Sequence, residues 1–141
     1  MKRKEIMNRA FAVTLFASLV VMAPCFVTAQ DFSELVTLLN GAKIIAQDDD
    51  NTYLGKLASE YNSESIFNEY GLYGSEYSSD SIWNKYGTFG GKYNRYSPFN
   101  KYTGTPPMII KGGKVIGYLT TNKAINGAVS PNLLKAIKDQ F

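Results

Sequence analysis

Residues 48–51, three aspartates and an asparagine, are the first group in this sequence that could bind a ligand. Asp48 and Asp50 partly match the start of an EF-hand loop, in which alternating oxygen ligands hold calcium. The match stops there, because Tyr53 stands where that loop needs a glycine and Ser59 stands where it needs a bidentate glutamate. We therefore expect a solvated turn between two strands, with a calcium site at Asp48 and Asp50 as the alternative.

Eleven aromatic residues between Phe67 and Tyr102 form a second group that could bind a ligand. They belong to a tandem repeat, in which residues 65–78 correspond to residues 81–94 and a third copy begins at Ser97. An exposed row of such rings could stack on the sugar rings of a glycan, with the tyrosine hydroxyls forming hydrogen bonds. The eleven residues are Phe67, Tyr70, Tyr73, Tyr77, Trp83, Tyr86, Phe89, Tyr93, Tyr96, Phe99 and Tyr102.

Burial in a core is the alternative role for these rings. Equivalent positions of stacked repeat units usually bury together, which predicts a core column of Phe67, Trp83 and Phe99. The same argument applies to a second column, made of Tyr70, Tyr86 and Tyr102. For tyrosines in the second half of each unit, core and binding surface are equally open, since their rings can pack while their hydroxyls stay hydrated. The candidate ligand-binding residues are Tyr73, Tyr77, Tyr93 and Tyr96.

The sequence offers few residues for catalysis. It contains no histidine, which is the commonest general base and a common metal ligand, and its one cysteine is Cys25 near the N-terminus. Glu60 and Glu76 occupy equivalent repeat positions, but Lys92 replaces the acid in the next copy, which argues against paired-carboxylate catalysis. We therefore assign no catalytic residue.

Hydrophobic periodicity and turn residues predict regular structure on both sides of the repeat. The pair Gly112 and Gly113 is typical of a hairpin turn, and Ser130 followed by Pro131 is typical of a helix start. The expected elements are a helix at 31–40, a hairpin of strands at 43–47 and 52–57, a second hairpin of strands at 108–111 and 114–119, and a C-terminal helix. These elements predict an α+β fold, in which a small antiparallel sheet flanks a repeat block at about residues 54–107.

Within the repeat block we expect compact, turn-rich units. Polar residues before each Ile–aromatic pair are suited to cap one or two helical turns, and Gly71 or Gly87 is suited to end them in the left-handed region. The capping candidates are Asn62, Ser63, Ser79 and Asp80. The equivalent asparagines are expected to hydrogen-bond the turn backbone of their own unit rather than a ligand. They are Asn68, Asn84 and Asn100. Disorder is the alternative for this block, although disordered segments are poor in aromatic residues.

Residues 1–29 have the pattern of a signal peptide. A basic start is followed by an apolar run from Ala10 to Val27, and the small-residue pattern around Ala29 predicts cleavage before Gln30. This leaves a single exported domain at residues 30–141; an uncleaved membrane anchor is the alternative. Four of the 15 basic residues and one of the 12 acidic residues lie in this segment, so the mature chain is neutral. We therefore expect it to bind no nucleic acid and to insert stably into no membrane.

The repeat and its flanking hairpins resemble a group of small, uncharacterised exported bacterial proteins. The resemblance rests on Ser-Ile-aromatic-Asn-x-Tyr-Gly-x-aromatic-Gly units followed by a Pro-Pro strand and a Gly-Tyr-Leu-Thr strand, from about Tyr53 to Asn122. In those proteins proline often follows the repeat asparagine, whereas here the residues are Glu69, Lys85 and Lys101. The resemblance implies export and association with the cell envelope, and it implies no reaction, cofactor or catalytic residue.

Two functions of different classes agree with these observations. The first is a non-catalytic module, secreted or periplasmic, that associates with wall glycan, a surface polymer or an envelope protein. The second is a secreted or periplasmic hydrolase or lyase that uses tyrosine, lysine or carboxylate side chains. The absence of histidine and the loss of the one cysteine with the signal peptide favour the first. Apart from the calcium alternative, we expect no cofactor.

Overall fold

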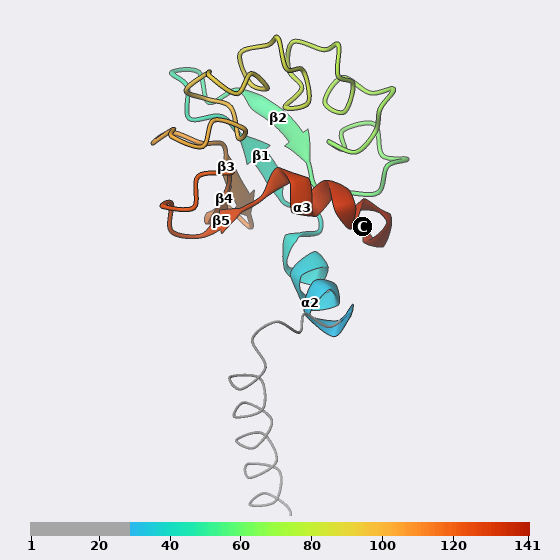
Figure 1. Cartoon of the computed structure of the whole chain (residues 1–141). Helices are drawn as coiled ribbons and strands as arrows, with labels where there is room; N and C mark the ends of the chain where they lie inside the picture. Colours follow the sequence, from blue (N-terminus) through green and yellow to red (C-terminus); the bar gives the residue numbers. More distant parts are fainter. Residues whose placement is uncertain (1–28) are drawn as a thin grey trace, which may run out of the picture. The chain divides into compact units, whose positions relative to one another are not determined.

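The computed structural model describes residues 29–141, of which residues 35–141 form one compact unit (Figure 1). Except for Ala29, the predicted signal peptide lies outside the described residues. Helix α2 (Ala29–Leu39) agrees with the helix expected at 31–40. Its Val36 and Leu39 are buried, and Gly41 follows with a φ of 85°, which ends the helix in the left-handed region.

A five-stranded sheet with the order β2-β1-β3-β4-β5 contains both predicted hairpins. Strand β1 (Lys43–Ile45) pairs antiparallel with β2 (Tyr53–Lys56), and β3 (Met108–Lys111) pairs antiparallel with β4 (Lys114–Leu119). Strand β1 also pairs antiparallel with β3, so strands from both sides of the repeat block join in one sheet. The expectation of a wholly antiparallel sheet is wrong, because the short strand β5 (Ala128–Val129) lies parallel to β4.

Local sequence explains the second hairpin and the C-terminal helix. Gly112 and Gly113 have φ values of 60° and 76°, which a two-residue hairpin turn needs at both positions. Helix α3 (Pro131–Ala136) begins as predicted, with the Leu133 N–H donating to the Ser130 hydroxyl. The helix has only six residues and is followed by a 3-10 helix (Lys138–Gln140). The fold is therefore α+β.

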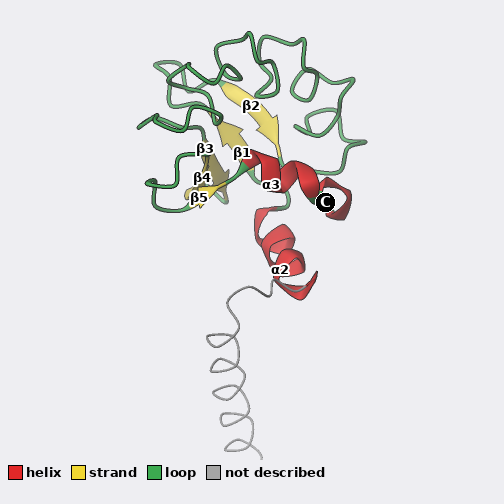
Figure 2. Cartoon of the chain, viewed as in Figure 1, coloured by secondary structure: helices red, strands yellow, loops and turns green. Residues whose placement is uncertain are grey.

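Between β2 and β3 the chain forms a continuous series of β-turns and no helix (Figure 2). Backbone N–H groups donate to carbonyl oxygens three residues earlier, and each turn ends where the next one begins. In each set of five turns, one turn is a residue longer than the others. Its N–H donates to the carbonyl oxygen four residues earlier, as from Ser75 to Gly71 and from Gly91 to Gly87. Five turns therefore span one sequence repeat, as from Ser65 to Ser81. The turns begin at Ser59, Asn62, Ser65, Asn68, Gly71, Ser75, Ser78, Ser81, Asn84, Gly87, Gly91, Asn94, Ser97 and Asn100. We call residues 59–103 the turn series.

The turn series replaces the short helices that the sequence predicted. Serine or asparagine at the first position of a turn accepts the N–H two residues ahead, as Ser65 does from Phe67 at 3.0 Å. This local hydrogen bond competes with a helix, so the predicted helix caps are turn residues instead. The four wrongly assigned caps are Asn62, Ser63, Ser79 and Asp80. Gly71 and Gly87 are also not left-handed, because they begin turns rather than end helices.

Glycine is required where successive turns contact each other. A Cβ atom at Gly74 would lie 1.9 Å from the carbonyl oxygen of Asn68. At the equivalent Gly90 it would lie 2.1 Å from the carbonyl oxygen of Asn84. No side chain fits at these distances, so the backbone of each set of five turns is closed tightly on itself.

One turn in each set of five begins with a serine that is buried in the core. The residues that begin it, Ser65, Ser81 and Ser97, are all completely buried, and so are Ile66 and Ile82. The first set is joined to the end of β2, since the Ile66 N–H donates to the Lys56 carbonyl at 3.0 Å. The last set is held by the segment after β4, where the Thr121 N–H donates to the Pro98 carbonyl at 2.7 Å. The turn that begins at Gly87 also buries a side chain, that of Phe89, whereas the turns that begin at Asn68, Asn84 and Asn100 carry exposed tyrosines. The turn series runs along one side of the sheet (Figure 1).

Candidate binding surface

Six tyrosines of the turn series are almost fully exposed, with exposed fractions between 82% and 98%. Each is the third residue of a turn, and every repeat unit contributes one member to each of two sets. The first set is Tyr61, Tyr77 and Tyr93, and the second is Tyr70, Tyr86 and Tyr102. Large aromatic side chains gathered on a surface in this way indicate an interaction site rather than a core.

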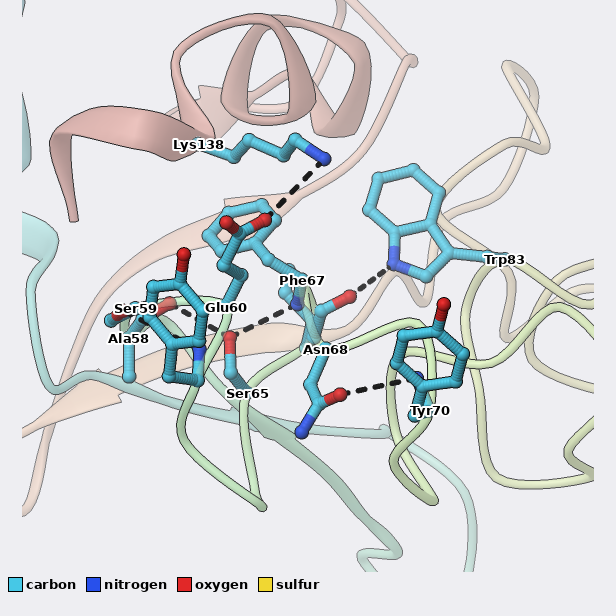
Figure 3. Close-up of polar contacts among 11 residues, drawn as sticks. Ala58, Ser59, Glu60, Ser65, Phe67, Asn68, Tyr70, Trp83 and Lys138 are labelled. Atoms are coloured by element: carbon cyan, nitrogen blue, oxygen red, sulfur yellow. Dashed lines mark hydrogen bonds and ion pairs between the residues drawn. The ribbon is translucent and has the colours of Figure 1, made fainter.

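Asparagine at the start of the turn holds the backbone at the tyrosines of the second set (Figure 3). The Asn68 side-chain oxygen accepts the Tyr70 N–H at 3.1 Å, and its amide nitrogen donates to the Asn62 carbonyl at 3.2 Å. Asn84 and Asn100 form the same pairs of bonds with the backbone. The prediction that these asparagines bind their own turns is therefore confirmed.

The column of Phe67, Trp83 and Phe99 is more deeply buried than the exposed tyrosines. Phe67 is buried as predicted, with its ring 5.2 Å from that of Phe141, whereas Trp83 and Phe99 are only half-buried. The rings of Trp83 and Phe99 are 5.7 Å apart, and the indole N–H donates to the Ile66 carbonyl at 2.5 Å (Figure 3). The expected burial of the second column is wrong, because Tyr70, Tyr86 and Tyr102 are all exposed to solvent.

Two pockets lie between successive sets of turns, on either side of Trp83. The first has a cavity volume of about 460 Å³, with Phe67 and Trp83 as its inner rings and Tyr70 and Tyr77 as its outer rings. Lys135 of helix α3 also lines it, and its ammonium group is 4.7 Å from the centre of the Trp83 ring.

The second pocket is built from the equivalent residues of the next repeat unit. It has a volume of about 560 Å³, with Trp83 and Phe99 as inner rings and Tyr86 and Tyr93 as outer rings. Gly90 lines it where Gly74 lines the first. Each pocket thus presents flat aromatic faces together with tyrosine hydroxyls, a combination that suits ligands with both an apolar face and polar groups.

A charged residue precedes every one of the six exposed tyrosines, and its sign changes along the series. The first three are Glu60, Glu69 and Glu76, and the last three are Lys85, Lys92 and Lys101. The three lysine ammonium groups lie between 5.1 and 5.2 Å from the ring centres of the tyrosines that follow them. On the acidic side, Glu60 forms an ion pair with Lys138 at 3.8 Å (Figure 3).

Two of the four tyrosines proposed from the sequence lie in the pockets. Tyr77 lines the first and Tyr93 lines the second, and both are 86% exposed. Tyr73 is instead half-buried, with its ring 5.0 Å from Tyr53, and Tyr96 is half-buried beside Arg95. The sequence reasoning missed the other four exposed tyrosines, Tyr61, Tyr70, Tyr86 and Tyr102. The feature they share is a serine or asparagine two residues before the tyrosine and a charged residue directly before it, a pattern that the half-buried Tyr96 also has.

Two tyrosine hydroxyls are held in their protonated form. Burial raises the pKa of Tyr53, and a hydrogen bond to Glu64 with its negative charge raises it further. At the exposed Tyr77, a hydrogen bond to the Glu76 carboxylate raises the pKa. The Tyr77 hydroxyl is therefore a hydrogen-bond donor to a carboxylate at the rim of the first pocket.

The sequence 48–51 forms the turn of the first hairpin. The Asp48 carboxylate accepts the Thr52 N–H at 2.8 Å and the Thr52 hydroxyl at 2.6 Å. Burial alone would raise the pKa of Asp48, but these hydrogen bonds outweigh it and lower the pKa. Asp50 is exposed. Within residues 29–141, no three acidic, cysteine or histidine side chains gather as a metal site would require.

Comparison with known proteins gives no match: no family model, curated protein or solved structure is similar to this chain. Among the helices of residues 29–141, none combines the length and hydrophobicity needed to span a membrane. Any assignment of function therefore depends on the surface itself.

Proposed function

We propose that the mature chain is an exported, non-catalytic module that adheres to a polymer of the bacterial cell envelope through the turn series. The observation that carries this proposal is the pair of equivalent aromatic pockets, each flanked by two of the six exposed tyrosines. Export is supported by the signal-peptide pattern of residues 1–29 and by the resemblance to exported proteins.

Tyrosine is suited to bind the residues of a glycan. One face of a sugar ring carries C–H groups that pack against an aromatic ring, while the sugar hydroxyls form hydrogen bonds with the phenol group. Tyrosine also has few rotatable bonds, so holding it in a complex costs little conformational entropy. The hydrogen bond between Asn68 and the Tyr70 N–H fixes the backbone that carries the ring before a ligand arrives.

The repetition of the pocket favours a polymeric ligand. A chain with a repeating unit can occupy the first and second pockets at once, so the second contact forms without the cost of a separate encounter. Weak binding at each pocket then gives strong adhesion overall. A single small substrate would use only one of two equivalent pockets.

Adhesion is tested by cosedimentation of the mature protein with isolated cell envelopes, purified wall glycan and protease-treated envelopes. We expect binding to be lost in a variant with serine at the four outer tyrosines of the pockets, Tyr70, Tyr77, Tyr86 and Tyr93. The control variant carries Leu38→Ser and Val115→Ser, which alter two exposed apolar residues outside the turn series and should leave binding intact.

Three preparations separate the partners. Binding to wall glycan identifies a glycan, and binding that protease treatment removes identifies an envelope protein instead. Equal cosedimentation of both variants with the unaltered protein would contradict the tyrosine surface. Chromatography of the supernatant tests the hydrolase or lyase alternative, since release of polymer fragments would show turnover and refute a purely adhesive role.

A further inference from the structure

The two aromatic pockets have the same construction but differ in charge. The first is lined by Glu69 and Glu76, and also by Lys135 and Lys138 from the C-terminal segment, so its charges balance. The second is lined by two basic residues, and no acidic side chain lies among its lining residues. They are Lys85 and Lys92, which occupy the positions equivalent to Glu69 and Glu76. The second pocket is therefore positively charged.

The lysines of the second pocket are available to a ligand. Lys85 and Lys92 are exposed, and neither forms an ion pair with a carboxylate within residues 29–141. Their ammonium groups lie 5.2 and 5.1 Å from the centres of the Tyr86 and Tyr93 rings, which border the same cavity. Two cations and four aromatic rings thus surround a space of about 560 Å³.

We propose that the second pocket binds an anionic sugar residue, one that carries a carboxylate or a phosphate, whereas the first pocket binds an uncharged part of the same polymer. This inference rests on the proposed function and names the chemical class of the polymer. The rings hold the apolar face of the sugar, as in the first pocket, and the two ammonium groups bind the negative group as point charges. A ligand with both an apolar face and a negative group makes both kinds of contact, whereas a neutral glycan or a simple anion makes only one of them.

The inference predicts selective binding of charged oligosaccharides by the intact mature protein. Isothermal titration calorimetry is carried out with a galacturonic acid trimer, its uncharged methyl ester and a glycerol phosphate oligomer. We expect one site for at least one of the two anionic probes and about tenfold weaker binding of the ester. Affinity for the anion should also fall as salt is raised toward about 1 M, where the screening length drops to about 3 Å. Carboxylate and phosphate sources are distinguished by which anionic probe binds.

Charge exchange between the pockets provides the decisive variants. Lys85→Glu with Lys92→Glu should weaken binding of the anionic probe by about tenfold or more. Lys114→Glu with Lys123→Glu changes the net charge equally at two exposed lysines elsewhere and should leave affinity within about twofold. The reverse exchange, Glu69→Lys with Glu76→Lys, should create a second anion site in the first pocket. The binding stoichiometry should then rise from one to two. A gained site cannot result from misfolding.

The inference is overturned if the ester binds as tightly as both anionic probes, if neither anion binds, or if the exchanged variants match the control. These outcomes are distinct from failure of adhesion. Envelope binding that depends on the tyrosines but not on Lys85 and Lys92 would remove the anionic specificity and leave the proposed function standing. Binding of the anionic probe without any adhesion to envelopes would support the anionic pocket and refute the proposed function.

Discussion

Replacing rings at three depths of the turn series tests how its core and its surface are divided. Phe67→Ala removes a ring that is 4% exposed, Trp83→Ala removes one that is half-buried, and Tyr70→Ala removes one that is 98% exposed. Because all three lie at the third position of a turn, the local backbone change is the same. Differences in the free energy of unfolding then report on what each ring contacts.

The expected costs follow from those contacts. Truncation of a buried phenylalanine costs about 3–5 kcal/mol, which applies to Phe67. Trp83 contributes an aromatic pair with Phe99, a hydrogen bond to Ile66 and a cation–π contact with Lys135. Each is worth about 0.5–1.5 kcal/mol, so the loss of all three should cost about 1.5–4.5 kcal/mol in total. Tyr70→Ala should change stability by no more than about 0.5 kcal/mol, as exposed substitutions usually do.

Urea unfolding followed by far-ultraviolet circular dichroism measures these free energies. Fluorescence is unsuitable, because Trp83 is the one tryptophan of the chain. Trp83→Phe serves as an internal control, since it keeps a ring and removes the indole N–H, and it should cost about 1 kcal/mol. Equal destabilisation by Tyr70→Ala and Phe67→Ala would refute the division into core and surface. So would a Trp83→Ala variant as stable as the original protein.

Three further predictions concern the backbone, the N-terminus and alkaline stability. Gly90→Ala should lower the melting temperature strongly, because its Cβ would overlap a backbone oxygen. Gly104→Ala should leave it unchanged in the same thermal denaturation experiment, because no atom lies within 4 Å of its Cβ. Mass spectrometry of the native protein should find an N-terminus at Gln30, and an intact Met1 form would contradict cleavage. Since the folded state raises the pKa of Tyr53, stability should fall above about pH 10, where the unfolded chain ionises and the folded one does not. Urea unfolding at pH 9 to 11 should show a smaller decline for Tyr53→Phe, and an unchanged decline would exclude this tyrosine as the cause.

Local chemistry was sufficient to predict most of the elements outside the turn series. Two consecutive glycines specify the turn between β3 and β4 because both positions need a positive φ. Ser130 and Pro131 specify the start of α3. The Ser130 side chain accepts the Leu133 N–H, which has no partner within the helix, and Pro131 has no N–H that would need one. Strand β5 could not be predicted, since a segment of two residues has no periodicity of its own and becomes a strand through its pairing with β4.

The turn series was recognised as a repeat, but its conformation was not. Serine and asparagine that accept a nearby N–H can cap a helix or begin a β-turn, and the two alternatives look alike in sequence. Their spacing of three residues, from Asn62 to Ser65 to Asn68, distinguishes the β-turns, because one turn ends where the next begins.

The regular period of the repeat determined that equivalent side chains share an environment, and it could not determine which environment that is. The tertiary structure decided it when the turn of the first set that begins at Ser65 was joined to the edge strand of the sheet at Lys56. Once that turn is buried, the geometry of the set places Phe67 against the C-terminal residues and Tyr70 in solvent. A pattern along the chain records the order of the turns, whereas burial depends on contacts with strands that are distant in sequence.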